Sequence, residues 1–435
     1  GAVCSLLSDI IIRMANNATF WKPALLILLL TCYSCDETKA LALNRLPPHA
    51  GYHGKTVSQS QPFFEGWYLR ITTPDNDSND ENNNNYTGPL AFIFHIFDPN
   101  KIPTSKRKGV GMQILTKDEK TFVVESSDVR RFKAATDRLD IKNTFLPRGD
   151  FFDVTPNKLV GKASDLDQEF YFDFDMVPQI GWGGERQHST AGWLAAFPVF
   201  EPHYQVLISK GEATGKIRIK NKSESKEDEE IYTIQNATVY LEKNWGSSFP
   251  SKWWWIQANA FPNNKNNLCV TSTGAKRRSP LLGKDDEEEV ALVGIHWKGE
   301  FLPFPDVRWN VQWGKWEIHG EYEDYRVVLT GTSEKGDTGT YVRCPTNEGM
   351  KETALETYNG KLRVQLYQRN ALLVDETTTN ACLEIGGLPW KNSNEWKGES
   401  GIKGPLSGIV LNRDMEQIGS NVLQLVNVFV DIPGL

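Results

Sequence analysis

The stretch EFYFDFDM, residues 169–176, alternates aromatic and acidic side chains with a period of two. Successive side chains of a β-strand point to opposite faces of the sheet, so this alternation is typical of a half-buried strand. Residues 204–211 and 215–220 are predicted to be the two arms of a hairpin. Further strand-like runs of this half lie at 62–73, 90–98, 109–115, 121–126 and 232–244. No amphipathic helix of more than three turns stands out, so we expect an all-β fold.

The strand pattern restarts at residue 253 and continues through about eight apolar runs that turn-rich gaps separate. Two groups of strands that meet near residues 245–255 predict two antiparallel β-barrels in tandem. The expected division is a targeting segment at 1–42, a first barrel at 43–248 and a second barrel at 249–435. Helices do not alternate with strands, which argues against a Rossmann-type nucleotide site.

Composition excludes some classes of function. The 435 residues suffice for two domains, and the formal net charge of −7 lacks the basic surface that nucleic-acid binding requires. The basic residues 276–278 and the acidic run 285–289 are predicted to form a solvated loop. The 6 cysteines show no zinc spacing. His49 and His53 are four apart, but Gly51 argues against a helix that would align them on a metal. We expect no metal site.

The N-terminal segment has the plan of a signal peptide. Met14 is a plausible start, an apolar run follows at 24–30, and Ala40-Leu41-Ala42 fits an A-x-A cleavage site. The apolar run is too short to span a bilayer. A lipid-attached Cys35 or an uncleaved anchor is the alternative.

The stretch HSTAGWLAAFPVFEPHYQ, residues 188–205, places Glu201 and His203 in an apolar and aromatic run. Burial among apolar side chains raises the pKa of a carboxyl group, which suits a general acid. The alternative is a core β-corner with a hydrogen-bonded histidine and a capping glutamate. Pro198 and Pro202 exclude a regular helix here.

Three other segments combine aromatic residues with an ionisable or amide group: FFEGWY, YLEKNWGSSFP and KWWWIQANAF. In the last of these, strand alternation places Trp253, Trp255 and Gln257 on one face, and Trp254 and Ile256 on the other. One face is expected to line a cavity and the other to pack on the neighbouring domain, although tryptophan clusters also simply fill barrel interiors. No G-x-S-x-G motif is present. An aromatic pocket with few charges suits a lipophilic ligand, while paired carboxylates for glycoside chemistry remain open.

These segments carry a resemblance to a known family. PHAGYH, FFEGWY, GVGMQIL, STAGWLAAFPVFEPHYQ, EKNWGSSFPSKWWWIQANAF, VGIHW and LEIGGLPW occur in this order between residues 48 and 390. The chain resembles the tocopherol cyclase family, which belongs to a wider group with two lipocalin-like barrels that includes carotenoid hydratases. The resemblance implies that two lipocalin-like antiparallel β-barrels follow each other along the chain.

The resemblance also implies a reaction of vitamin E biosynthesis. A prenylated benzoquinol, such as 2-methyl-6-phytyl-1,4-benzoquinol, closes its chroman ring when an acid protonates the side-chain alkene and the phenol oxygen attacks the cation. No cofactor is required. The alternatives are a lipocalin-like carrier of a prenyl lipid, which needs no carboxyl group in its pocket, and a carotenoid-hydratase-like enzyme with a wetter pocket.

Roles follow for individual residues as hypotheses. The candidate acids are Glu201, Glu65, Glu242 and Asp98, and His203 is expected to orient the acid or to take the phenol proton. The candidate substrate-binding residues are Trp67, Tyr68, Trp193, Phe197, Phe200, Asn244, Trp245, Trp255 and Gln257. Asn244 and Gln257 are expected to bind the quinol hydroxyls, and the tryptophan and phenylalanine side chains to line the prenyl channel.

Some features depart from the family pattern. The chain has EPHYQ where EPHWQ is expected, and it carries polar inserts at 74–86 and 221–230. A signal sequence also begins plastid import in algae with plastids of secondary origin, so a plastid location is expected, with a secretory or endomembrane location as the alternative. Because a prenyl quinol dissolves in lipid, peripheral association with a plastid membrane or lipid droplets is expected.

Overall fold

A computed structural model describes most of the chain between residues 47 and 400. The described residues are 47–73, 86–101, 105, 107–117, 120–183, 187–190, 202–222, 229–262, 266–278, 287–334, 338–387 and 395–400. They all belong to one compact unit, Pro47–Asn412. The predicted targeting segment lies outside the described residues. The same holds for four candidate site residues, Glu201, Trp193, Phe197 and Phe200.

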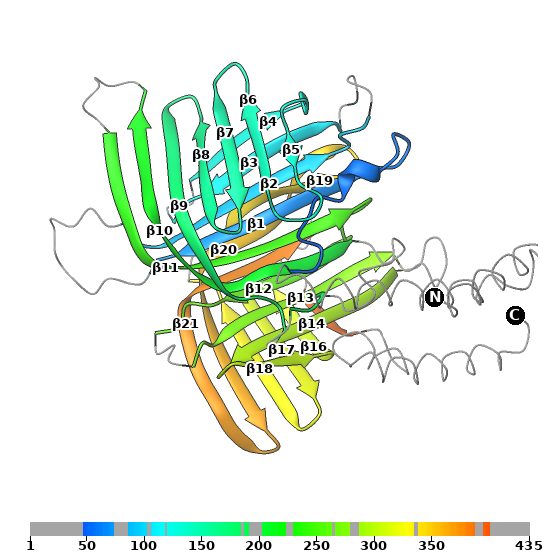
Figure 1. Cartoon of the computed structure of the whole chain (residues 1–435). Coiled ribbons are helices and arrows are strands. Elements are labelled where there is room, and N and C mark those ends of the chain that lie inside the picture. The colour runs from blue at the N-terminus through cyan, green and yellow to red at the C-terminus, as the bar shows by residue number, and fades with distance from the viewer. Residues whose placement is uncertain are drawn as a thin grey trace, which may run out of the picture. The chain divides into compact units, whose positions relative to one another are not determined.

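The first half of the chain forms one antiparallel sheet (Figure 1), which a short 3-10 helix, η1 (Gly54–Thr56), precedes. Its strands are β1 (Phe64–Thr72), β2 (Pro89–Phe97), β3 (Gly109–Leu115), β4 (Thr121–Ser126), β5 (Lys133–Ala134), β6 (Ile141–Phe145), β7 (Asp150–Thr155), β8 (Lys158–Ser164), β9 (Gln168–Ile180), β10 (His203–Asn221) and β11 (Glu229–Gly246). They pair in the order β4-β3-β2-β1-β11-β10-β9-β8-β7-β6-β5. The sheet curls so far that β4 contacts β6 and β8.

The second half forms another antiparallel sheet, drawn from green to orange in Figure 1. Its strands are β12 (Lys252–Ala258), β13 (Cys269–Arg278), β14 (Glu287–Trp297), β15 (Glu300–Phe304), β16 (Asp306–Gln312), β17 (Lys315–Tyr322), β18 (Tyr325–Thr332), β19 (Thr340–Thr346), β20 (Gly349–Gln368), β21 (Ala371–Gly386) and β22 (Trp396–Glu399). The order is β15-β14-β13-β12-β21-β20-β18-β17-β16-β22, with β19 paired to β20. This sheet also curls, since β14 contacts β16 and β22. The predicted all-β class with two successive barrel-like antiparallel sheets is confirmed.

Each curled sheet is filled by its own apolar side chains. The first core contains Phe92, Phe94 and Phe172, and the second contains Trp254 and Trp316. Burial of one such side chain stabilises the fold by about 1.5–3 kcal/mol. Because apolar side chains fill both interiors, we do not expect a ligand to bind inside either curled sheet.

The outer faces of the two sheets pack against each other. Tyr68 from β1 and Tyr240 from β11 belong to the same buried cluster as Trp253 and Trp255 from β12. The Arg70 Nη1 atom of β1 donates a 3.0 Å hydrogen bond to Gln257 Oε1 of β12. The predicted division of residues 253–257 into two faces is confirmed, because Trp254 packs inside the second sheet and the opposite face meets the first sheet. The expectation that one face lines a cavity and the other packs on the neighbouring domain is wrong, because Trp253 and Trp255 do both.

The predicted hairpin at 204–220 is wrong, because these residues form one continuous strand, β10. Register shifts between Val206 and Ile208, Ile208 and Gly211, and Ala213 and Gly215 bend the strand without ending it. A Cβ atom at Gly215 would lie 2.1 Å from the Asp173 carbonyl oxygen. Glycine is needed there for close strand approach, and not for a turn between two hairpin arms.

The predicted solvated loop of basic and acidic residues is also wrong where the structure describes it. Lys276 to Arg278 end β13 and pair with Glu287 to Glu289 at the start of β14. The Arg277 Nε atom lies 2.9 Å from Glu288 Oε1. Opposite charges on facing strand positions stabilise the ladder, so this charge pattern is a cross-strand one.

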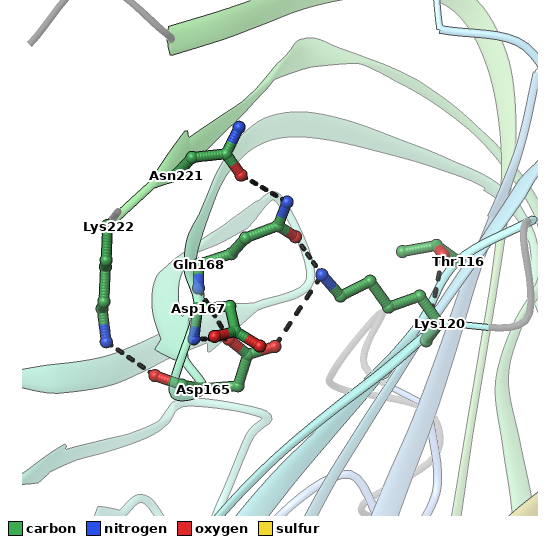
Figure 2. A network of polar contacts seen from close by, with 7 residues as sticks. All are labelled: Thr116, Lys120, Asp165, Asp167, Gln168, Asn221 and Lys222. Atoms are coloured by element: carbon green, nitrogen blue, oxygen red, sulfur yellow. Dashed lines mark hydrogen bonds and ion pairs between the residues drawn. The ribbon is translucent and has the colours of Figure 1, made fainter. Parts of the chain in front are cut away.

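A polar network ties the β3–β4 turn to the β8–β9 turn in the first sheet (Figure 2). Lys120 contacts the side chains of Gln168 and Asp165. Gln168 Nε2 also donates a 2.6 Å hydrogen bond to Asn221 Oδ1 at the end of β10. The Lys222 Nζ atom donates to the Asp165 carbonyl oxygen at 2.6 Å. These contacts hold the curl of the sheet at one end of its strands.

No helix within the described part of the chain is both long enough and apolar enough to cross a lipid bilayer.

Candidate active site

A cavity of about 230 Å³ lies between the two sheets. Strands β1, β2, β10 and β11 line it from the first sheet, and strands β12, β13, β14 and β21 from the second. Its aromatic wall comprises Phe64, Tyr68, Phe97, Phe249, Trp253 and Trp255. Among its polar lining groups are two carboxyl groups, Glu242 and Glu384, together with His95 and Asn244.

Glu242 lies near the C-terminal end of β11, opposite Tyr68 of β1. Its Oε2 atom accepts hydrogen bonds from the hydroxyl groups of Tyr204 and Tyr240, both at 2.6 Å, and from Trp255 Nε1 at 3.1 Å. Tyr240 stands two residues before Glu242 and so shares its face of the strand, whereas Tyr204 comes from β10 and Trp255 from the other sheet. Three uncharged donors therefore converge on one carboxyl oxygen.

The environment of Glu242 fits a proton donor. Burial raises the pKa of its carboxyl group to about 7, and the hydrogen bonds from Tyr204, Tyr240 and Trp255 limit that rise. The group is therefore substantially protonated at neutral pH. When it releases its proton, the three donors stabilise the carboxylate that remains, as a general acid requires.

Two further buried carboxyl groups, Glu356 and Glu384, face each other across β20 and β21. Glu356 accepts hydrogen bonds from Tyr68 Oη at 2.8 Å and Tyr358 Oη at 2.6 Å, and the Trp253 indole N–H donates to Glu384. Burial raises the pKa of both groups, and for Glu384 the charge of Glu356 raises it further. The environment of both carboxyls thus favours the neutral form over the charged one.

Sequence reasoning missed Glu356 and Glu384. A signal existed for Glu384, because LEIGG places one acid in an otherwise apolar run. Glu356 has no such signal, because charged and polar residues stand on both sides of it in KETALETYN. Neither local pattern reveals that the two acids lie opposite each other.

Glu65 is bound in a different way from the candidate acid Glu242. It is fully buried and lies 2.5 Å from the Lys243 ammonium group, which is also fully buried. The His53 backbone N–H donates to Glu65 Oε2 at 2.8 Å. Burial by itself would raise the pKa of this carboxyl, but the charges of Lys243 and His53 and the hydrogen bonds from both residues together hold the pKa below its usual value. Glu65 is thus an anion within an ion pair, outside the cavity lining.

His203 and Trp245 pack against each other outside the cavity lining. Their ring centroids are 5.0 Å apart, and the His53 ring stacks on the same indole at 4.3 Å. Burial lowers the pKa of His203 to about 4, with further lowering by the charges of His53, Arg277 and Lys243. His203 is therefore a neutral imidazole at physiological pH.

Asp98 and Gln257 make contacts that join strands. Asp98 Oδ1 accepts a 2.8 Å hydrogen bond from the Phe63 backbone N–H, and Asp98 Oδ2 lies 3.1 Å from Arg107 Nε. Gln257 is the acceptor for Arg70 between the two sheets. Both lie outside the cavity lining. The predicted residues that the structure brings to the cavity are Glu242, Trp67, Tyr68, Asn244 and Trp255.

The described residues contain no group of three or more histidine, cysteine, aspartate or glutamate side chains that would hold a metal ion.

Replacing Tyr204 with phenylalanine is expected to shift the pH dependence of any acid chemistry at Glu242. The change removes a 2.6 Å donor that favours the carboxylate, so the pKa of Glu242 should rise by about one unit. The alkaline limb of the pH–rate profile should move upward by the same amount. Tyr171→Phe, which removes a hydroxyl donating to Glu169 outside the cavity, is the matched control. An unmoved limb in Tyr204→Phe would contradict the assignment.

Comparison with known proteins bears on this site. The family described as "Tocopherol cyclase-like" matches residues 61–387. The "Tocopherol cyclase, chloroplastic" of Zea mays is 34% identical over 405 residues, covering 83% of this chain and 82% of its own. The "Probable tocopherol cyclase, chloroplastic" of Oryza sativa subsp. japonica is 32% identical over 402 residues, covering 81% and 80% respectively.

Among solved structures, a provisionally assigned AttH protein from Nitrosomonas europaea superposes with a TM-score of 0.44 at 12% identity, covering 78% of this chain and 95% of its own. A likeness at this TM-score carries no argument about function. The family match spans most of the chain and includes β1 with Tyr68, β11 with Glu242 and β12 with Trp255. The predicted resemblance is therefore confirmed, and the chain belongs to the tocopherol cyclase-like family.

Proposed function

We propose that this protein is a tocopherol cyclase that closes the chroman ring of a prenylated 1,4-benzoquinol. The observation that carries the proposal is a neutral carboxyl group, Glu242, on an aromatic cavity between the two sheets. A carrier of prenyl lipids has no need for a carboxyl group in this position. The sequence relatives named as tocopherol cyclases support the same activity.

The first step is transfer of the Glu242 proton to the side-chain alkene. The Oε2 atom already accepts its three hydrogen bonds, so Oε1 is the oxygen available to carry the proton. Protonation at the less substituted alkene carbon leaves a tertiary cation. The faces of Trp253, Trp255 and Tyr68 in the cavity wall stabilise that positive charge through their ring quadrupoles.

The second step is ring closure. The phenol oxygen forms a bond to the cationic carbon and loses its proton to the Glu242 carboxylate, so the acid is regenerated and no electrons are gained or lost. The apolar cavity wall keeps water from capturing the cation in place of the phenol. No cofactor enters either step.

The other candidate residues are proposed to have one of two roles, according to whether they border the cavity. Tyr68, Trp255 and Asn244 are proposed to contact the substrate, because they border the cavity. The Trp67 side chain packs in the core of the first sheet and is proposed to support the cavity wall from behind. Glu65, Asp98, His203, Trp245 and Gln257 are proposed to support the site by holding neighbouring strands.

Location and domain organisation belong to the same proposal. Both plant relatives are named as chloroplastic proteins, which supports a plastid location here. Import through an N-terminal signal sequence is proposed from the N-terminal sequence pattern. Peripheral association with a plastid membrane or lipid droplets is proposed because a prenylated quinol dissolves in lipid. We also propose a domain boundary at 248/249, since β11 ends at Gly246 and β12 begins at Lys252.

The test is incubation of purified protein with 2-methyl-6-phytyl-1,4-benzoquinol under anaerobic conditions, followed by mass spectrometry and chromatography. A chromanol of unchanged mass is the expected product. Tight binding without any product would favour the carrier. A carotenoid substrate that gains the mass of one water would favour the hydratase.

The pH dependence gives a further expected result. Only the protonated form of Glu242 donates, and the pKa of the group is raised to about 7. The rate should therefore stay level at acidic pH and fall as pH rises through about 7, approaching tenfold per pH unit above it. A pH–rate profile of kcat between pH 5 and 9 measures this. A rate that increases with pH over this range would contradict an acid-catalysed first step at Glu242.

A further inference from the structure

Gly66 interrupts a row of side chains on the cavity face of the first sheet. Across the strands, it pairs with His95 of β2 on one side and with Asn244 of β11 on the other. All three residues line the cavity. The residues two positions away on β1, Phe64 and Tyr68, carry large side chains on the same face. Gly66 therefore forms the floor of a gap with a polar group at each side.

Packing does not explain the glycine. Glycine in the interior of a strand weakens the strand, and it often marks a place where a ligand approaches the backbone. A Cβ atom at Gly66 would meet only the Phe94 carbonyl oxygen, at an ordinary 3.6 Å. At Gly111 the opposite holds, because a Cβ atom there would lie 2.5 Å from His95 Cε1. Gly111 makes room for the His95 ring, whereas the space above Gly66 is open to the cavity.

His95 has an unused hydrogen-bonding capacity in this place. Its side chain is buried, with 4% of the residue exposed, and neither ring nitrogen has a hydrogen-bond partner among the described residues. Glu125 Oε1 lies 3.8 Å from Nε2, too far for a hydrogen bond. Burial, and secondarily the charge of Arg343, lowers the pKa of His95 to about 3, so the ring is neutral. A buried polar group without a partner is costly, and a ligand hydroxyl would remove that cost.

Asn244 supplies the matching group on the other side. Its amide both donates and accepts hydrogen bonds. Because neighbouring strands lie about 4.8 Å apart, the backbone positions of His95 and Asn244 are separated by about 9.6 Å. The His95 ring leans over Gly111, on the side away from Asn244, so the gap between the two side chains is wider than this backbone separation. The wider gap admits a flat aromatic ring that carries a hydroxyl at each para position.

We propose that the benzoquinol head ring binds over Gly66, with one hydroxyl hydrogen-bonded to His95 and the para hydroxyl to Asn244. This subsite rests on the proposed function and identifies the part of the substrate that the first sheet recognises. It holds the ring against β1 and β2, so that the prenyl side chain extends toward the aromatic wall and Glu242. The ring is thereby positioned for attack by its own phenol oxygen.

The test uses a tail-free probe, trimethyl-1,4-benzoquinol, whose binding does not depend on cyclisation. Gly66→Val fills the gap with branched methyl groups that suit a strand and should weaken probe binding by about tenfold or more. The KM for the prenylated quinol should rise by a similar factor, with a smaller change in kcat. Gly66→Ala should give an intermediate loss, and it serves as the second variant if the valine variant does not fold. Calorimetric titration and thermal unfolding are the measurements.

His95 is tested separately by His95→Phe, which keeps a ring and removes both nitrogens, and by His95→Gln, which restores one polar group. We expect His95→Phe to weaken probe binding about tenfold and His95→Gln to recover part of the loss. His319→Gln on exposed β17 is the matched control and should bind as the unaltered protein does.

Unchanged probe binding in both Gly66→Val and His95→Phe would overturn the subsite. If the unaltered protein nevertheless forms chromanol, the proposed function holds without it. Probe binding that these variants weaken, in a protein that forms no chromanol, would overturn the proposed function and keep the subsite.

Discussion

Glu242→Gln is expected to lower kcat for chromanol formation by about 10²–10⁴-fold, the contribution that a positioned general acid typically makes. Glutamine keeps the size of the side chain and an oxygen that accepts hydrogen bonds from Tyr204, Tyr240 and Trp255. It has no acidic proton for the alkene. Substrate affinity should therefore change little while the chemical step is lost. Single-turnover kinetics with the prenylated quinol separates the two effects.

Glu384→Gln is the comparison for this experiment, because Glu384 is the other carboxyl group that lines the cavity among the described residues. Glutamine can keep the bond to the Trp253 indole and also relieves the repulsion with Glu356. We expect this variant to keep far more activity than Glu242→Gln. The reverse order of activities, in folded protein, would make Glu384 the proton donor and would contradict the assignment to Glu242.

The second large effect is expected on stability. Glu65→Leu should lower the free energy of unfolding by about 3–5 kcal/mol, because it leaves the Lys243 ammonium group buried without its counter-ion. Lys243→Met should cost a similar amount at neutral pH. Because the pKa of Glu65 is lowered in the folded protein, the stabilisation by the pair is present above the pKa of the unfolded chain and is lost as pH falls. Urea unfolding at pH 7 and at lower pH measures both.

The double variant Glu65→Leu/Lys243→Met is the control for this cycle. Replacing both charges with apolar groups of similar size removes the unpaired charge, so most of the lost stability should return. A double variant as unstable as the sum of the single variants would show that the ion pair is not the cause. A single variant Glu65→Gln that folds, yet loses cyclisation as completely as Glu242→Gln, would return Glu65 to the candidate acids.

The candidate acids show where local sequence suffices and where it does not. Glu65 and Glu242 have similar local settings, since each stands in a strand beside aromatic residues. Lys243 pairs with Glu65 from the neighbouring strand and makes it an anion, whereas tyrosine hydroxyls and an indole surround Glu242 and keep it close to neutral. The pKa of a buried carboxyl depends on the groups that other strands bring to it, and these are distant in sequence.

The amino-acid sequence alone determined the all-β class, the succession of two antiparallel sheets and the family, because period-two alternation and long local motifs are properties of contiguous residues. It did not distinguish a bulged strand from a hairpin at 204–220, since glycine serves both close strand approach and turns. Only the tertiary structure decided that the cavity lies between the sheets and that Glu242 is its proton donor candidate. The outer faces of the two sheets meet there and bring together residues that are far apart in the sequence. Tyr68 and Glu356, for example, are hydrogen-bonded although 288 positions separate them. The proposed role of Gly66 and His95 in binding the head ring likewise depends on tertiary structure. Pairing between strands decides how much space lies above Gly66 and which groups surround His95.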